Sequence, residues 1–205
     1  MSSFSGFKTE NTKGNCSDSR KGTAMELKHI NLKSKTDVDR ARKLYLEAFP
    51  KAERAPFRLL TNRAKKGRGD MFDLVHDGAW CGMAYAITFA DMVYLFYFAV
   101  DSAQRGNGLG SQAIKAILDK YSGKRVFLAL ENWNEPSDNA EQRIKRHSFY
   151  QKCGLSDLPY RIKEASMTYS IMGVNGKIDP DEYKVLIGNY LGFPLKYLIE
   201  MRIVK

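Results

Sequence analysis

The sequence has few residues that could bind a metal ion or form disulfides. Among 205 residues there are three cysteines and three histidines, and neither set shows the short spacings of a zinc site. Cys81 and Cys153 stand in apolar surroundings, which favours reduced, buried thiols. We therefore expect no metal site, no disulfide framework and a reducing, cytoplasmic location.

Long apolar runs are also missing. No run reaches the roughly 18 residues of a membrane helix, and the N-terminus is polar where a signal peptide would have its apolar centre. Residues 1–24 are rich in Ser, Thr, Gly, Asn and Lys and have no periodicity. We expect a disordered tail or leader there, followed by a single domain over 25–205, because this length suits one packed core.

Positive charge is abundant, with a formal net charge of +10. Such a charge fits nucleic acid, an anionic membrane, a polyanionic ligand or a merely lysine-rich surface. The basic turn "KKGRGD", with Lys65, Lys66 and Arg68, has no interleaved aromatic residues, which favours a solvated turn over a nucleic-acid patch. We expect neither a membrane nor a nucleic-acid partner.

Apolar periodicity predicts alternating strands and helices. The expected elements are a strand over 25–32, helices over 36–49 and 56–66, an antiparallel three-strand meander over 71–100, a helix over 109–121, a strand over 124–131, a helix over 140–152 capped by Ser137 or Asp138, and strand material at 167–174 and 195–204 around a helix over 179–190. The strand, helix and strand over 92–131 should form a right-handed parallel crossover. The predicted class is α/β (α+β), with a mixed, mostly antiparallel sheet flanked by helices.

The glycine cluster "QRGNGLGS", residues 104–111, lies between a predicted strand and a predicted helix. Glycines weaken regular elements, but they let backbone N–H groups approach a phosphate at a helix N-terminus. A dinucleotide fold would place G-x-G-x-x-G here. Gly106 and Gly108 fit and Glu131 ends the next strand, but Ser111 stands at the third glycine position and the preceding meander is antiparallel. The cluster could also be a turn that binds no ligand, and this alternative stays open.

The cluster also satisfies R-x-x-G-x-G through Arg105, Gly108 and Gly110. At this point the sequence resembles the GCN5-related N-acetyltransferase (GNAT) superfamily. "FAVDSAQRGNGLGSQAI" is similar to its acetyl-CoA pyrophosphate loop with the strand before it, and "FYQKCGL", which contains Tyr150, is similar to its second signature. The order of elements from residue 25 to about 174 follows the family. One departure is Arg143, which stands where many members carry Asn.

The resemblance implies the GNAT acyl-CoA N-acyltransferase fold and an acetyltransferase that uses acetyl-CoA and a primary amine in a ternary complex. It implies a gap between the two parallel strands, in which the cofactor arm lies. It makes Tyr150 the general acid for the leaving thiolate and Glu131 the leading candidate base, with Asp91 and Tyr97 as weaker options. The cofactor-binding residues that it implies are Phe98, Ala99, Val100, Arg105, Gly106, Asn107, Gly108, Leu109, Gly110, Ser111 and Arg143.

The acceptor, a small-molecule or peptide amine, would be selected by the early helices and the segment "FPKAERAPF" between them. Glu53 and Arg54 in this segment could bind a charged acceptor, but the pattern favours surface residues that flank a helix turn. Neither Cys81 nor Cys153 is placed to carry an acyl group. The alternative function is a non-catalytic CoA-binding or basic partner-binding domain of the same fold, and a homodimer stays open.

Overall fold

The computed structural model describes residues 24–164, 167–193 and 201–204. In chain order the elements are β1 (Met25–His29), α1 (Lys35–Ala48), η1 (Lys51–Glu53), α2 (Phe57–Lys65), β2 (Asp70–His76), β3 (Ala79–Phe89), β4 (Met92–Val100), η2 (Ser102–Gln104), α3 (Leu109–Lys120), β5 (Arg125–Glu131), α4 (Ala140–Lys152), β6 (Ser156–Glu164), β7 (Met167–Val174), α5 (Pro180–Leu191) and β8 (Met201–Val204). The predicted tail up to residue 23 and the predicted strand positions 195–200 lie outside the described residues.

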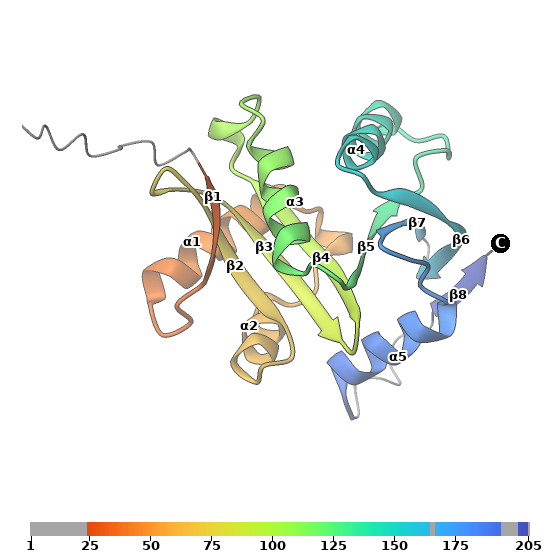
Figure 1. Cartoon of the computed structure of the whole chain (residues 1–205), viewed down its shortest axis with the longest axis horizontal. Coiled ribbons are helices and arrows are strands. Elements are labelled where there is room, and N and C mark those ends of the chain that lie inside the picture. The colour runs from red at the N-terminus through yellow and green to blue at the C-terminus, as the bar shows by residue number, and fades with distance from the viewer. Residues whose placement is uncertain (1–23, 165–166, 194–200, 205) are drawn as a thin grey trace, which may run out of the picture.

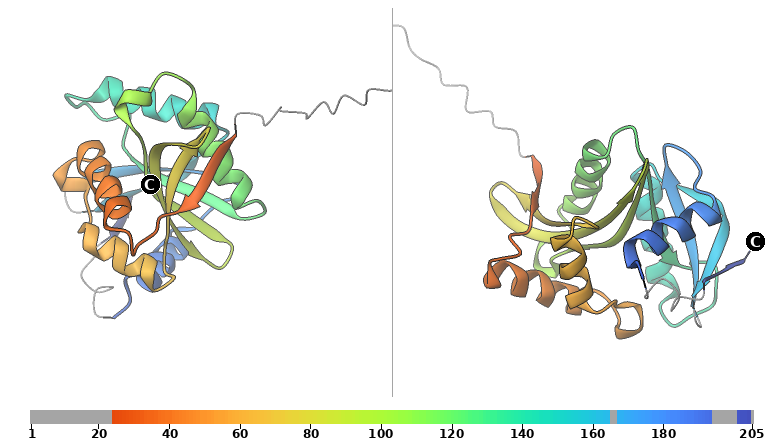
Figure 2. Two further views of the ribbon diagram at one scale, coloured as in Figure 1. Left: turned by 90° about the vertical axis from the view of Figure 1, so that its left-hand side faces the viewer. Right: turned by 90° about the horizontal axis from the view of Figure 1, so that it is seen from below.

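The strands form one sheet in the order β1-β2-β3-β4-β5-β7-β6-β8 (Figure 1). All neighbours are antiparallel except β4 and β5, which run parallel. The prediction of a mixed, mostly antiparallel sheet is therefore confirmed, as is the parallel β4-α3-β5 unit. Figure 2 shows α3 on one face of β1–β4 and α1 with α2 on the other.

The meander β2-β3-β4 has its turns at the two predicted breaks. At the first, Asp77 and Gly78 have φ of 51° and 78°. Two successive positive φ angles match the right-handed twist of a hairpin. Asp tolerates this left-handed conformation better than most residues, and Gly adopts it without steric cost. The "HDG" break therefore predicted a strand end for the correct physical reason.

Two local predictions fail. Strand β6 was not predicted, since Pro159 interrupts it and polar residues surround the proline. The structure accommodates Pro159 in a register shift between Asp157 and Arg161, where no ladder hydrogen bond is needed from it. The N-cap residue of α4 is Asn139, not Ser137 or Asp138, and its side chain makes no capping hydrogen bond. The Ser137 hydroxyl donates to Asn139 Oδ1 at 2.9 Å instead of capping the helix.

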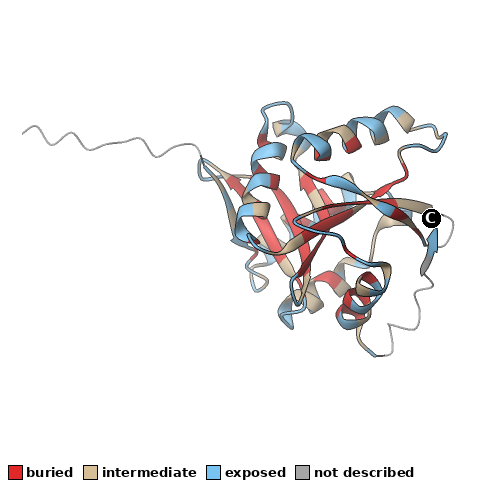
Figure 3. Ribbon diagram, turned by 45° about the vertical axis from the view of Figure 1, so that its right-hand side comes forward, coloured by how far each residue is buried: buried red, intermediate tan, exposed pale blue. Residues whose placement is uncertain are grey.

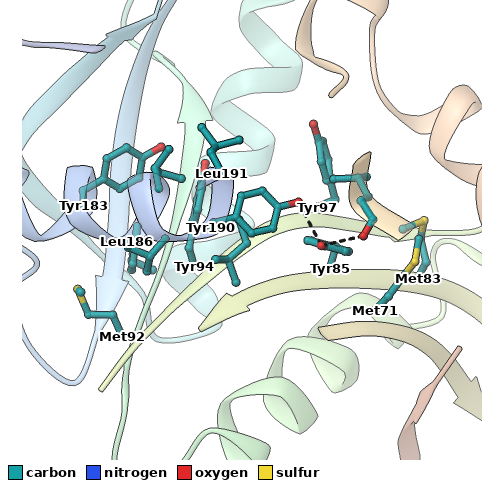
Figure 4. Packing of buried hydrophobic residues seen from close by; sticks show 14 of the residues in the cluster. Met71, Met83, Tyr85, Met92, Tyr94, Tyr97, Tyr183, Leu186, Tyr190 and Leu191 are labelled. Carbon is teal, nitrogen blue, oxygen red and sulfur yellow. Dashed lines mark hydrogen bonds between the residues drawn. The ribbon is translucent and has the colours of Figure 1, made fainter. Parts of the chain in front are cut away.

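The apolar residues form two clusters, one on each face of the sheet. The first joins α1, α2 and α5 to the strands and is rich in tyrosine (Figure 4). In this cluster the Tyr85 hydroxyl donates to Leu60 O and is hydrogen-bonded to the Tyr190 hydroxyl, both at 3.1 Å. These two contacts connect α2 and α5 to β3. The second cluster packs α3 and α4 against the other face. Buried positions concentrate in the central strands (Figure 3).

The predicted helix after β7 is confirmed as α5, and its start has a clear local cause. Asp179 and Glu182 form a capping box, in which each side chain bonds a backbone N–H of the first turn, and Pro180 occupies the first helical position. Among the described residues, no helix has both the length and the apolar character needed to cross a membrane.

Candidate functional site

Strands β4 and β5 pair along only part of their length. Their parallel register covers Met92 with Arg125, Val93 with Val126 and Tyr94 with Phe127. Beyond these pairs β4 continues to residue 100 and β5 to residue 131, and the two strands diverge (Figure 1). A register shift in the β3-β4 ladder leaves Phe96 as an extra residue in β4 at the point of divergence. Such a bulge increases local twist and turns a strand away from its neighbour.

A cavity of about 1050 Å³ occupies this divergence. That volume is slightly above the range of about 300–1,000 Å³ typical of small-molecule and cofactor sites. Its walls come from segments that are far apart in the sequence. They are 48–50 and 52–55 before α2, 94–100 of β4, 104–106 and 108–111 of the glycine loop, 128–131 of β5, positions 142, 145, 146, 149 and 150 of α4, and Ile162, Tyr169 and Tyr183.

The glycine loop forms one wall, and its glycines have two different roles. Gly106 and Gly108 have φ of 90° and 71°, and a Cβ on either would meet no atom within 4 Å. Their requirement is therefore for the left-handed backbone, not for space. At Gly110 a Cβ would lie 3.3 Å from Phe149 Cζ, so this glycine lets α3 approach α4 closely.

The same loop brings the start of α3 to the cavity. Gly108 is the N-cap of α3 and offers no side chain to cover the first amides of the helix. These N–H groups have no intrahelical acceptor and carry the partial positive charge of the helix N-terminus. Arg105 Nε donates to Val100 O at 3.1 Å and thereby fastens the loop to the end of β4. An anion in the cavity would find oriented donors here.

Most of the predicted cofactor-binding residues line the cavity, and two do not. Phe98, Ala99, Val100, Arg105, Gly106, Gly108, Leu109, Gly110 and Ser111 are part of its wall. Asn107 and Arg143 are not in the wall. The Arg143 side chain is only 11% exposed because Nη2 bonds Glu131 Oε1 at 2.9 Å and Nη1 bonds Asn132 O at 3.3 Å. Helix α4 presents Lys145 and Arg146 to the cavity instead.

Tyr150, the predicted acid, lies on α4 with 7% of its surface exposed and lines the cavity. Burial raises its pKa well above the usual value for tyrosine, and the positive charge of Arg146 opposes that rise only in part. The hydroxyl therefore keeps its proton at neutral pH and is able to donate it to a stronger base.

Glu131, the predicted base, ends β5 and is 6% exposed in the cavity wall. Arg143 donates to its Oε1 at 2.9 Å, and Asn139 Nδ2 donates to its Oε2 at 3.3 Å. Arg146 Nη1 lies 3.7 Å from Oε2. These donors from the start of α4 compensate a carboxylate that is almost fully buried.

Glu53 joins this group although the sequence pattern did not favour it. The turn that carries Glu53 is held at the cavity by hydrogen bonds from two tyrosines. The Tyr97 hydroxyl donates to Glu53 O at 3.0 Å and accepts from Ala55 N at 2.9 Å, and the Tyr45 hydroxyl donates to Ala55 O at 2.8 Å. Glu53 and Glu131 line the same cavity, and burial together with the charge of Glu131 raises the pKa of the Glu53 carboxyl. No local motif indicates that Glu53 lies in the wall of this cavity.

The remaining candidates lie elsewhere. Asp91 sits at the paired end of β4, where two hydrogen bonds from Arg125, at 2.7 and 2.8 Å, hold the pKa of the Asp91 carboxyl below its usual range. Cys81 is buried and Cys153 half-buried, and neither is in the cavity wall. Within the described part of the chain, no group of three His, Cys, Asp or Glu residues could hold a metal ion.

The wall opposite α3 is aromatic. The cavity is lined by Phe49 directly after α1, by Tyr94 and Phe96 of β4, by Tyr169 of β7 and by Tyr183 of α5. Tyr94 also packs edge-on against Tyr183, with ring centroids 5.4 Å apart (Figure 4). The cavity therefore has one end built from backbone amides and cations and another end built from aromatic rings and the two carboxyl groups.

Comparisons with known proteins give one consistent picture. A family model described as "Acetyltransferase (GNAT) family" matches residues 38–155, from α1 to the end of the α4 region. No curated protein matches the sequence.

Solved structures show the fold at low sequence identity. A putative GNAT-family acetyltransferase from Bacteroides thetaiotaomicron is 20% identical with a TM-score of 0.67, and the match covers 83% of this chain and 98% of that one. The ribosomal-protein-S18-alanine N-acetyltransferase from Escherichia coli is 17% identical over 77% of this chain and 97% of that one, with a TM-score of 0.55. An aminoglycoside 6'-N-acetyltransferase complexed with coenzyme A is 12% identical over 75% and 99%, with a TM-score of 0.56.

Proposed function

The chain belongs to the GNAT acetyltransferase family, and from this premise we propose that it transfers the acetyl group of acetyl-CoA directly to a primary amine. The observation that carries the proposal is the parting of β4 and β5 after three residue pairs, beside a glycine loop that opens α3. We assign the whole reaction to one domain over 25–205. Acetyl-CoA, when bound, supplies the activated thioester.

The amide end of the cavity fits the diphosphate of coenzyme A. The N–H groups from Gly106 to Ser111 would bond it, with the partial charge of the α3 N-terminus in support. Lys145 and Arg146 add two cations on the facing helix. The ladder between β4 and β5 ends at Tyr94 in the described structure, so the edge of β4 beyond it would lie beside the pantetheine arm and could bond its amides.

Tyr150 and the pair of carboxyl groups, Glu53 and Glu131, would then carry out the two proton transfers of the reaction. Tyr150 donates its proton to the leaving sulfur, which requires a hydroxyl that is still protonated at working pH. A carboxylate of the pair, for which Glu131 is the residue expected from the sequence, accepts a proton from the amine. An N–H of the β4 edge polarises the carbonyl group, and such a fixed dipole acts without reorganising when charge develops.

Direct transfer is favoured over an acyl-enzyme route. A covalent carrier would need a nucleophilic thiol facing the thioester. Cys81 and Cys153 are both outside the cavity wall, and burial raises the pKa of each, which disfavours the thiolate.

The acceptor is proposed from the chemistry of the cavity's other end. The fold neighbours named above act, by their names, on a ribosomal-protein alanine and on an aminoglycoside. In this chain the acceptor end is lined by Phe49, Tyr94, Phe96, Tyr169 and Tyr183. Burying an apolar group against these rings is favourable by about 25 cal/mol per Å², so we propose an amine with an apolar body over a polyhydroxylated one.

The test has two stages. Acetyl-CoA at about 100 times its Kd should stabilise the protein by about 2.7 kcal/mol and raise Tm by roughly 5–10 °C, while NAD at the same concentration should not. A panel of amines is then screened for acceptor-dependent release of free thiol, with hydrolysis in the absence of acceptor as the control. Stabilisation without thiol release would favour the non-catalytic CoA-binding alternative, and stabilisation by NAD alone would contradict both.

A further inference from the structure

We propose that Glu53, carried by the turn between α1 and α2, is the group that takes the proton from the attacking amine, and that Glu131 is its charged partner and not the base itself. This assignment rests on the proposed acetyl transfer and names a catalytic residue for it. Three observations support it: the hydrogen bonds that Glu131 already accepts, the surroundings of the Glu53 carboxyl, and the fixed position of the turn that carries Glu53.

Glu131 is already engaged on both oxygens. Arg143 donates to Oε1 at 2.9 Å and Asn139 to Oε2 at 3.3 Å, with Arg146 3.7 Å from Oε2. Protonating Glu131 would give up its charge-assisted hydrogen bond from Arg143, which is stronger than one between neutral groups. It would also leave a buried guanidinium without its counter-charge, a costly arrangement in a protein interior. The hydrogen bonds to Glu131 therefore favour its negatively charged form in the cavity wall.

Glu53 has the opposite character. Burial is the largest cause of its raised pKa, the charge of Glu131 adds to it, and the charges of Arg146 and Arg143 oppose it. Two carboxyl groups in one site cannot both ionise easily, so the one with fewer donors takes up the proton. The neighbouring Arg54 directs Nη1 to Leu46 O, at 3.4 Å, on the α1 side of the turn. A base with raised proton affinity is better matched to proton transfer near neutral pH.

The position of Glu53 is fixed by the strand that borders the opening. Tyr97 of β4 bonds the main chain on both sides of Arg54, through Glu53 O at 3.0 Å and Ala55 N at 2.9 Å. Tyr45 of α1 bonds Ala55 O at 2.8 Å. The tyrosine rings also pack edge to face, with centroids 4.8 Å apart. Glu53 thus belongs to a turn that Tyr97 and Tyr45 hold in place, and it lines the same cavity as Tyr150.

The proton balance is complete with these groups. As the bond from the amine nitrogen to the carbonyl carbon forms, one N–H proton moves to a Glu53 carboxylate oxygen. The carbon–sulfur bond breaks with its electron pair on sulfur, and the Tyr150 hydroxyl proton moves to sulfur. Glu53 then releases its proton to water, and Tyr150 regains one from water, so that the products are an N-acetyl amine and a free thiol.

The first experiment compares Glu53→Gln with Glu47→Gln, which removes an equal charge from an exposed position on α1. With the best amine from the panel, Glu53→Gln should lower kcat by about 100-fold at neutral pH, the size typical of a lost general base. It should also abolish the acidic limb of the kcat/KM profile, because that limb follows deprotonation of Glu53 as pH rises through its raised pKa. Acetyl-CoA affinity by calorimetry should be unchanged, and Glu47→Gln should match the wild type throughout.

The second experiment separates the two carboxyl groups. Glu131→Gln removes the charge that raises the pKa of Glu53, so its acidic limb should move to lower pH but persist. Glu53→Asp should recover part of the lost turnover, which a merely structural role for Glu53 would not predict. Circular dichroism of each variant checks that it is folded before the rates are compared.

The outcomes for the base and for the transferase are distinguishable. An active wild type with an unchanged pH profile in Glu53→Gln, or an acidic limb that disappears in Glu131→Gln while it persists in Glu53→Gln, overturns the assignment of Glu53. A wild type that binds acetyl-CoA but releases no thiol with any amine overturns the proposed function, and this assignment falls with it.

Discussion

The two ends of the cavity are built in different ways. The cofactor end is local in sequence, since residues 98–111 supply the strand edge, the glycine loop and the start of α3. Its working groups are backbone amides, placed by glycines with positive φ. The acceptor end is assembled from side chains on α1, the turn before α2, β4, β5, β7 and α5. A short motif can specify the first kind of site, whereas the second exists only after the chain has folded.

Because of this difference, substitutions at the two ends of the cavity should change different measured quantities. Changes at the glycine loop should alter acetyl-CoA affinity, whereas changes among the carboxyl and tyrosine side chains should alter turnover and pH dependence at unchanged affinity. Helix α4 is the link, because it gives Lys145 and Arg146 to the cavity wall while Arg143 holds Glu131.

The largest effect is expected from Gly108→Asp at the cofactor end. A carboxylate there would face the diphosphate, and two like charges about 4 Å apart cost about 4 kcal/mol at a protein surface, which is more than 100-fold in affinity. Calorimetry with acetyl-CoA measures it. The matched control is Gly123→Asp, whose φ of 80° imposes the same backbone demand in a turn outside the cavity wall. Unchanged affinity in Gly108→Asp would refute the role of the loop.

Tyr150→Phe should give the next largest effect, with the opposite pattern. Turnover should fall by about 100-fold, as is typical when a general acid is lost, while acetyl-CoA affinity stays the same. Steady-state thiol release measures the first quantity and calorimetry the second. The control is Tyr121→Phe, which removes the hydroxyl that donates to Asp70 at 2.7 Å, outside the cavity wall. Equal turnover in Tyr150→Phe would remove Tyr150 from the mechanism.

Arg143→Met tests the link between the two ends. It leaves Glu131 buried without its main counter-charge, and breaking such a pair costs about 3 kcal/mol of unfolding free energy. Urea denaturation measures the loss. The control is Lys145→Met on the same helix, whose pair with Glu141 is exposed, with side-chain exposures of 79% and 90%, and should cost no more than about 0.5 kcal/mol. Equal stabilities of the two variants would contradict the buried pair.

The smallest predicted effect is that of Tyr97→Phe at the acceptor end. The change removes a donor to Glu53 O and an acceptor for Ala55 N, each worth about 1 kcal/mol. Turnover should fall roughly threefold to tenfold as the turn loosens, with acetyl-CoA affinity unchanged. Tyr85→Phe is the control, because it also loses hydroxyl contacts but does not hold this turn. The same turnover in Tyr97→Phe and wild type would show that the tether does not position Glu53.

The sequence predicted those parts of the molecule that depend on local patterns. The breaks of the meander, the β4-α3-β5 unit and the start of α5 follow from turn residues, helical periodicity and capping, and the structure confirms each of them. The failures arise where side chains take partners from distant segments. Asn139 is the N-cap residue of α4, but its side chain donates a hydrogen bond to Glu131. Pro159 is tolerated in β6 because a register shift removes it from the hydrogen-bonded ladder.

The candidate site shows the same division. The expected glycine-loop wall is present apart from Asn107, because strand, glycines and helix are contiguous. Arg143 was expected at the cofactor and instead pairs with Glu131. Glu53 lies in a turn with no motif of its own, and hydrogen bonds from Tyr97 and Tyr45 hold that turn at the cavity. Tyr183 reaches the cavity from α5, beyond the region that the family model matches.

The most direct measurement of the central claim is a crystal structure of the protein with acetyl-CoA. We predict diphosphate oxygens at hydrogen-bonding distance from the amides between Gly106 and Ser111, with the thioester lying between the diverging ends of β4 and β5. A bound coenzyme whose diphosphate lies away from this loop, or one that leaves the space between the two strands empty, would contradict it.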